Sequence, residues 1–241
     1  MSRKVLLLCI VILSFVFCGC VNKANIQCKP VLFPMPEHGY KAEPHLLDDT
    51  FAKPDGREII EYSGLKIAIP EGWHHEKVFK GKRLKLYKNR ERFLLFSSEH
   101  SEMVSAPLPT LLKYLNDTDC NWNSLKSNTP RKTSRDFYTD LYLFTDRQLS
   151  DDPESWPWQY MILWFKRDLL HHAERMIYYK GRNLEAFQLN KAPYVRSDLE
   201  SHTSIEIFHN RMTAEYYRIG ANFADDVFFA DFINRLNDLN P

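Results

Sequence analysis

The feature that most constrains the fold is a series of short stretches between residues 57 and 239 in which apolar and polar side chains alternate. In the clearest one, residues 65–69, the apolar side chains at every second position are Leu65, Ile67 and Ile69. A period of two places them on one face, as in a strand with one buried side. Comparable alternation, or a composition rich in β-favouring residues, predicts further strands at 58–62, 84–87, 92–96, 137–144 and 158–165.

Two later segments predict hairpins. Residues 176–187 indicate two strands around a turn at Gly181, and the alternative is one helix over 169–187, which the glycine would weaken. Residues 205–208 and 214–219 indicate a second hairpin. The sheet is therefore expected to be mainly antiparallel, because strands joined by short turns run in opposite directions.

The chain is predicted to close with a helix. Over residues 225–239 the apolar side chains recur at helical spacing, and Asp225 and Asp226 are favourable at the helix N-terminus. A shorter helix is indicated at 109–116. The predicted fold class is α+β: mainly antiparallel sheet, with packed helices and a C-terminal amphipathic helix.

The first nineteen residues are typical of a secretory signal peptide. Arg3 and Lys4 precede an apolar run over residues 5–17, and small residues follow it. The run is too short to cross a bilayer, which takes about 20 apolar residues. We expect residues 1–19 to be removed on export.

The end of this segment resembles the lipobox of bacterial lipoproteins. Gly19 stands directly before Cys20, whereas Phe17 and Cys18 depart from the usual Leu and Ser or Ala. The resemblance implies that Cys20 is acylated and becomes the N-terminus. The alternative is an ordinary signal peptide cut nearby, which would leave Cys20 as a free thiol.

The residues after Cys20 favour the outer membrane. Val21 and Asn22 are not the acidic pair that retains lipoproteins in the inner membrane of cells with two membranes. The resemblance thus implies a lipid anchor in the outer membrane and a protein that faces the periplasm.

Residues 20–56 indicate a lipidated N-terminus followed by a proline-rich linker. Five prolines interrupt every helix candidate there: Pro30, Pro34, Pro36, Pro44 and Pro54. Residues 57–241 then form a single predicted α+β domain. A linker of this kind would hold the domain away from the membrane surface.

The charge balance argues against nucleic acid as a partner. Removing Arg3 and Lys4 with the signal lowers the 32 basic residues by two, to 30, against 31 acidic residues. Nucleic-acid binding normally needs a basic patch. The expected partners are the membrane, through the lipid, and another protein.

Cysteine usage fits export. Cys28 and Cys120 remain in the mature chain, and an oxidising periplasm would permit a disulfide between them. Two separate thiols are the alternative.

Residues 62–73 resemble the opening hairpin of PsbP/Mog1-like domains. These domains often begin with a glycine turn, an alternating strand and a Pro-x-Gly-Trp stop, which here is Pro70, Glu71, Gly72 and Trp73. They often end with a strand and an amphipathic helix. The resemblance implies an α/β/α sandwich that acts by binding, and it transfers no catalytic residue.

We predict no metal site, no cofactor and no enzymatic activity. The pairs at 74–75 and 171–172 are the best metal candidates, but adjacent strand residues point to opposite faces. The chain has no H-E-x-x-H helix, phosphate-binding loop or nucleophile elbow.

Four aromatic residues are the candidates for partner binding: Trp156, Trp158, Tyr179 and Tyr217. Tryptophan and tyrosine dominate binding hot spots. The alternative for the tryptophans is that Trp158 begins a core strand and Trp156 packs over its edge. In the pairs 178–179 and 216–217, we expect one buried ring and one exposed ring.

These features predict a non-enzymatic binding lipoprotein. Its most specific form is an immunity protein that covers the active site of a periplasm-acting toxin, such as a secreted phospholipase. The alternatives are a housekeeping factor for envelope assembly and a lipoprotein that binds a small ligand.

Overall fold

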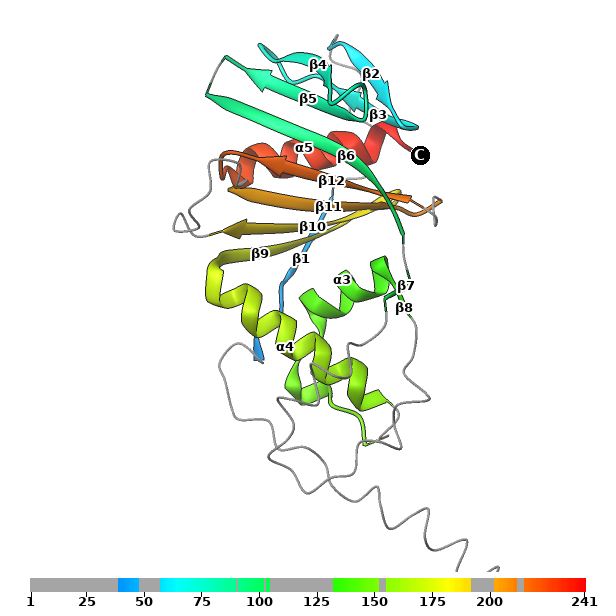
Figure 1. Ribbon diagram of the computed structural model, residues 1–241, viewed down its shortest axis with the longest axis vertical. Helices are drawn as coiled ribbons and strands as arrows, with labels where there is room; N and C mark the ends of the chain where they lie inside the picture. The colour runs from blue at the N-terminus through cyan, green and yellow to red at the C-terminus, as the bar shows by residue number, and fades with distance from the viewer. Residues whose placement is uncertain are drawn as a thin grey trace, which may run out of the picture.

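A computed structural model describes residues 39–47, 57–89, 91–101, 103–104, 132–151, 155–191, 202–211 and 215–241 of the protein. Within these residues the chain is an α+β fold with a large sheet and three α-helices, one of them C-terminal (Figure 1). The helices are α3 (Ser134–Leu143), α4 (Trp156–His172) and α5 (Asp226–Leu239), and a 3₁₀ turn covers Asp146–Gln148.

Eight strands form the main sheet, in the order β1-β9-β10-β11-β12-β6-β5-β4. They are β1 (Pro44–Leu46), β4 (His74–Val78), β5 (Arg83–Lys88), β6 (Arg92–His100), β9 (Ala173–Lys180), β10 (Leu184–Lys191), β11 (Thr203–His209) and β12 (Glu215–Ala221). Every neighbouring pair is antiparallel except β1 and β9, which are parallel. Two small ladders stand apart, β2 (Ile59–Tyr62) with β3 (Leu65–Ala68), and β7 (Met103–Val104) with β8 (Lys132–Thr133).

One face of the main sheet, the α5 face, is covered by α5 and by the β2–β3 hairpin. The helix buries one side of its length against strand residues of this face. The helix residues are Phe229, Phe232, Ile233 and Leu236, and the strand residues include Leu86, Phe96, Ile205 and Ile219. Burial of each large apolar side chain contributes about 1.5–3 kcal/mol, so this layer is a principal source of stability.

The opposite face, the α4 face, carries the alternate residues of the same strands and is covered over only part of its width. Under α3 and α4 it presents aromatic rings, Tyr178, Phe187, Phe208 and Tyr216. Figure 1 shows both helices at the β1–β9 end of the sheet, away from β4 and β5. Among the described residues, neither helix therefore covers the α4 face over β5, β6 and the part of β12 at Arg218 and Gly220, and this is the open half of the face.

Residues 39–47 are part of the folded body. β1 pairs with β9, and the Ala42 amide donates to the Tyr142 carbonyl at 3.0 Å. Lys166 of α4 is fully buried, and its ammonium donates to the Tyr40 carbonyl at 2.9 Å and to the Phe144 carbonyl. The predicted linker over 20–56 was thus wrong for residues 39–47, because Pro44 begins an edge strand, where proline costs no ladder hydrogen bond.

Two predicted strands are helices. Of the predicted strand 137–144, residues 137–143 fall in α3. This helix begins with a capping box: the Thr133 hydroxyl accepts from the Asp136 amide, and the Asp136 carboxylate accepts from the Thr133 amide. Residues 158–165 fall in α4, whose first turn holds a proline. Aromatic and β-branched composition favoured strands, but the cap and the seventeen-residue length of α4 favour helices.

The other predicted elements within the described residues agree with the structure. The hairpin at 176–187 is β9 and β10, the one at 205–219 is β11 and β12, and the closing helix is α5. The strands at 58–62, 65–69, 84–87 and 92–96 are β2, β3, β5 and β6. The single helix over 169–187 is not formed, and the predicted helix at 109–116 lies outside the described residues. The histidine pair at 74–75 begins β4, which the sequence did not predict.

Candidate functional site

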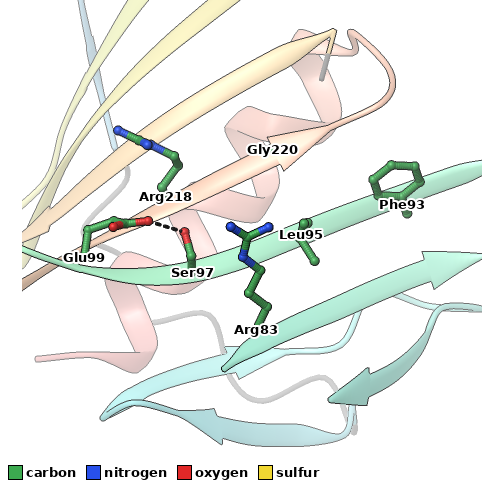
Figure 2. A pocket seen from close by; sticks show the side chains of 7 residues that line it. All are labelled: Arg83, Phe93, Leu95, Ser97, Glu99, Arg218 and Gly220. Carbon is green, nitrogen blue, oxygen red and sulfur yellow. Dashed lines mark hydrogen bonds between the residues drawn. The ribbon is translucent and has the colours of Figure 1, made fainter. Parts of the chain in front are cut away.

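The open half of the α4 face contains a hollow of about 170 Å³ on the surface of β5, β6 and β12. We call the residues that line it the open half-face: Arg83, Phe93, Leu95, Ser97, Glu99, Arg218 and Gly220. Figure 2 shows their side chains on the three strands, with Arg83 extending from β5 toward β6. The hollow combines two guanidinium groups with an apolar floor.

The alternation of β6 produces this arrangement. Leu94 and Phe96 point into the core beneath α5 and are fully buried. Phe93, Leu95 and Ser97 are therefore directed to the other side of the sheet, because successive side chains of a strand point to opposite faces. They remain partly exposed.

The register places the two arginines in one row. Ser97 lies opposite Arg83 on one side and opposite Arg218 on the other. Each cross-strand step is about 4.5–5.5 Å, so the two arginine backbones lie about 10 Å apart. The small Ser97 side chain leaves room between them for part of a ligand.

Arg218 is positioned by a buried carboxylate. Its Nε donates to Oε1 of Glu206 at 2.8 Å, and the Glu206 side chain is only 7% exposed. Burial raises the pKa of Glu206, and Arg218 offsets part of this by favouring the charged form. The ion pair holds the guanidinium at the boundary between the open half-face and the covered half.

Arg83 has no carboxylate partner among the described residues. Its guanidinium carbon lies 5.0 Å from the ring centre of Phe79, an exposed residue of the β4–β5 turn. The neighbouring Lys85 is paired, because its ammonium lies 3.2 Å from Glu76. Arg83 therefore brings to the hollow a positive charge that no described carboxylate neutralises.

Ser97 and Glu99 form a pair at the end of the hollow nearest α3. The Ser97 hydroxyl donates to Oε1 of Glu99 at 2.8 Å, as Figure 2 shows. No histidine belongs to the set of residues that line the hollow. One carboxylate oxygen of Glu99 therefore already accepts a hydrogen bond within the protein. No described carboxylate accepts one from Arg83.

The predicted partner-binding tyrosines are in the interior. Tyr179 is 1% exposed, and its hydroxyl donates to Gln188 at 2.8 Å. Tyr217 is 0% exposed, and its hydroxyl donates to the Ser63 carbonyl at 2.6 Å. Their use as exposed contacts was wrong, because the α5 layer covers the face to which they point.

The expectation of one exposed ring in each tyrosine pair was also wrong. Tyr178 and Tyr216 point to the α4 face, as the alternation requires, but α3 covers them there. Both rings of each pair are consequently buried. The sequence pattern located the faces but not the second layer of helices.

Trp158 is also buried, at 3% exposure, within α4. Its indole nitrogen donates to Asp140 of α3 at 2.7 Å, and the Lys132 ammonium lies 4.9 Å from its ring centre. It joins the two helices and cannot contact a partner in this fold. Trp156 lies in the first turn of α4, and Cys20, Cys28 and Cys120 lie outside the described residues.

His74 and His75 do not gather with other metal ligands in the described part of the chain. His74 and His75 lie on the edge strand β4, and Nε2 of His75 is 3.2 Å from Glu58. The pair at 171–172 ends α4. Among the described residues no group of three or more histidine, cysteine, aspartate or glutamate side chains could hold a metal ion.

Comparison with family models, with curated proteins and with solved structures gives no match for this chain. The described helices include none that is both long and apolar enough to span a bilayer. Function must therefore be inferred from the residues themselves, and the open half-face is their most distinctive grouping.

The open half-face was not predicted, although the sequence contains one signal for it. In residues 92–100 the outward positions of β6 hold Phe93 and Leu95, which are apolar on a side that should face water. A strand that is apolar on both sides near an arginine-bearing neighbour indicates either a second covering layer or a binding surface. Which arginines lie beside it depends on the strand order.

Proposed function

We propose that this protein is a non-enzymatic binding module, anchored by lipid at Cys20 in the outer membrane and facing the periplasm, which holds a protein partner on its open half-face. The observation that carries this proposal is the hollow on a sheet surface that no described helix covers, where Arg83 is exposed and has no carboxylate partner among the described residues. Apolar surface rimmed by charge is typical of protein contacts.

Binding fits these residues better than catalysis. Ser97 is the hydroxyl of the hollow, and its hydrogen-bond acceptor is the Glu99 carboxylate. A serine nucleophile is normally activated by a histidine or lysine base that a third group orients, and the lining residues include neither. Two arginines beside an apolar floor favour holding an acidic group over transforming it.

The finer family assignment is a PsbP/Mog1-like domain. It is supported by the glycine turn and the Pro-x-Gly-Trp stop in residues 62–73, and by the order of elements from β2 to α5, which ends in a strand and a helix. In that reading, β2 and β3 with α5 form one layer of a sandwich, and α3 with α4 forms the other.

The finer biological role is immunity against a periplasm-acting toxin of the phospholipase type. It is supported by the export signal, the lipobox resemblance at Cys20 and the predicted arm between the anchor and the domain. The mechanism is steric: the domain covers the mouth of the toxin's active site at the membrane where the toxin works.

The binding function is tested by recovering the tagged full chain from its own cells and asking whether a stoichiometric partner accompanies it. Leu95→Glu places a carboxylate on the floor of the hollow and should reduce the recovered partner at least tenfold, since the new group competes with the partner for the arginines and removes the apolar floor. Val227→Glu is the matched control, because Val227 is 82% exposed on α5, which packs on the other face. Equal recovery from both variants would refute the assignment of the surface.

The immunity role is tested by deleting the gene and growing the strain beside toxin-armed siblings. The deletion strain should be outcompeted, and the full chain should restore it whereas Leu95→Glu should not. A defect that is already present without an attacker would instead favour the envelope-assembly role.

A further inference from the structure

We infer that the hollow of the open half-face binds a carboxylate side chain of a protein partner, held between Arg83 and Arg218, with an adjacent apolar side chain on the floor formed by Phe93 and Leu95. This inference rests on the binding function proposed above and names the chemistry of the group that is bound.

The charges of the hollow select an anion. Among the described residues Arg83 has no carboxylate within ion-pair distance, and its guanidinium carbon lies 5.0 Å from the ring centre of Phe79. The Nε of Arg218 donates a hydrogen bond to Glu206, and the guanidinium has two further nitrogens. The Arg218 side chain is 45% exposed. A guanidinium has five donors in a fork that matches a carboxylate, so each arginine has donors to offer.

The lining residues leave more donors than acceptors. Oε1 of Glu99 already accepts from Ser97 and Glu206 accepts from the Nε of Arg218, so the donors left over are those of Arg83 and the remaining guanidinium nitrogens of Arg218. A cationic ligand would meet both arginines at close range, where like charges repel. A carboxylate meets them with the opposite sign.

The floor accounts for the apolar part of the ligand. Leu95 lies opposite Gly220, which has no side chain, and Phe93 continues the apolar surface along β6. The ammonium of Lys85, which is paired with Glu76, lies 5.9 Å from the Phe93 ring centre and borders this apolar surface. An apolar side chain next to the bound carboxylate would fill this part of the hollow.

The size of the hollow favours a protein as the source of the carboxylate. Small-molecule sites are usually clefts of about 300–1,000 Å³ that enclose most of the ligand. A hollow of about 170 Å³ on an open sheet encloses little. A partner protein supplies the remaining contact area from its own surface, so one acidic residue of that surface suffices for the hollow.

The test is an NMR titration of the ¹⁵N-labelled full chain with the pentapeptide acetyl-Gly-Leu-Asp-Leu-Gly-amide. We expect saturable shifts of the Arg83 and Arg218 Nε–H signals and of the backbone amides of 95–99. The same peptide with Asn in place of Asp should bind about tenfold more weakly, because hydrogen bonds to a charged group contribute more than those to a neutral one.

Arg83→Gln should weaken binding of the Asp peptide by a similar factor of about ten. Arg182→Gln is the matched control, an exposed arginine of the β9–β10 turn, and should leave the titration unchanged. The unperturbed signals of the α5 layer report that the variants are folded. Octanoate, which carries a carboxylate on an alkyl chain, is titrated in parallel.

Equal binding of the Asp and Asn peptides, or shifts that leave Arg83 and Arg218 unmoved, would overturn the carboxylate chemistry. Tighter binding of octanoate than of the peptide would overturn the inference that the bound carboxylate belongs to a protein. If either result is found while Leu95→Glu still loses the partner, the carboxylate inference is refuted and the proposed binding function is not. Partner recovery that is insensitive to Leu95→Glu refutes the proposed function itself.

Discussion

The two halves of the α4 face belong to one continuous sheet, yet they present different chemistry. The covered half meets α3 and α4 with stacked rings: Tyr178 and Phe187 are 5.1 Å apart, and Phe208 and Tyr216 are 4.9 Å apart, centre to centre. The open half has arginines, a serine, a glycine and two half-exposed apolar side chains. The covered half stabilises the fold, and we propose that the open half binds.

A single row of paired residues crosses from one half to the other. From β5 to β9, its members on successive strands are Arg83, Ser97, Arg218, Glu206, Phe187 and Tyr178. The change from charge to ring occurs at the Arg218–Glu206 pair, whose carboxylate is buried and whose guanidinium is not. At the edge of the area that α3 and α4 cover, the residues of this row change from aromatic to charged between one strand and the next.

The sharpest test of this difference is truncation of one side chain in each half. Phe187→Ala removes a fully buried ring that contacts four other rings, and should lower the free energy of unfolding by about 3–5 kcal/mol. Leu95→Ala, in the open half, should cost at most about 1 kcal/mol, because its side chain is already partly exposed. Denaturant unfolding of both variants measures this, and equal losses would mean that the open half is also a core surface.

The covered half also contains a buried charge whose effect depends on pH. Burial lowers the pKa of Lys166 to about 8, and Asp140 and Asp146 offset part of the shift. Between pH 8 and 10.5 the unfolded state binds a proton that the folded state has released, so this lysine makes the protein more stable as pH rises. The total gain is on the order of 3 kcal/mol.

Lys166→Met should lack that gain. The difference in unfolding free energy between the natural chain and the variant should therefore change by that amount from pH 8 to 10.5, while the buried tyrosines affect both proteins alike. Parallel pH profiles would contradict a lowered pKa for the buried ammonium of Lys166 in α4.

The boundary pair gives a smaller effect. Arg218→Gln leaves the buried Glu206 carboxylate without its cation and should cost about 1–3 kcal/mol at pH 7. Because burial raises the pKa of Glu206 in the folded state, the stability of this variant should be greatest below the ordinary value of 4.5 and fall as pH rises through the raised pKa. Adding Glu206→Gln should remove the pH dependence, as thermal unfolding across pH 4–8 would reveal.

The smallest effect is expected for Arg83. Arg83→Gln should change the free energy of unfolding by less than about 0.5 kcal/mol, because this exposed side chain has no described ion pair. A loss above about 2 kcal/mol would show that Arg83 supports the fold, and its role in ligand binding would need another explanation.

Much of the architecture could be predicted from the sequence, and the reasons are local. The alternation at 65–69, the glycine between β9 and β10 and the helical spacing in α5 each act over a few residues. The errors at α3 and α4 have a local cause too, since aromatic content was weighted above the Thr133 cap and the segment length. The inclusion of residues 44–46 in the sheet could not be predicted, because it depends on pairing with β9 far along the chain.

The site was less predictable than the fold. Arg83 and Arg218 are far apart in sequence and meet only because β12 and β5 both pair with β6. Burial of Tyr179, Tyr217 and Trp158 depends on layers that period-two patterns do not reveal. The one accessible signal was the apolar outward face of β6 at Phe93 and Leu95.

The most direct measurement of whether the open half-face holds a partner is site-specific photo-crosslinking in living cells. A photoreactive amino acid at position 95 should give one strong crosslinked species, and the same group at position 227, on the exposed start of α5, should give none above background. That species should weaken when Arg83→Gln is added. Crosslinking at position 227 but not at position 95 would contradict a binding role for the open half of the sheet.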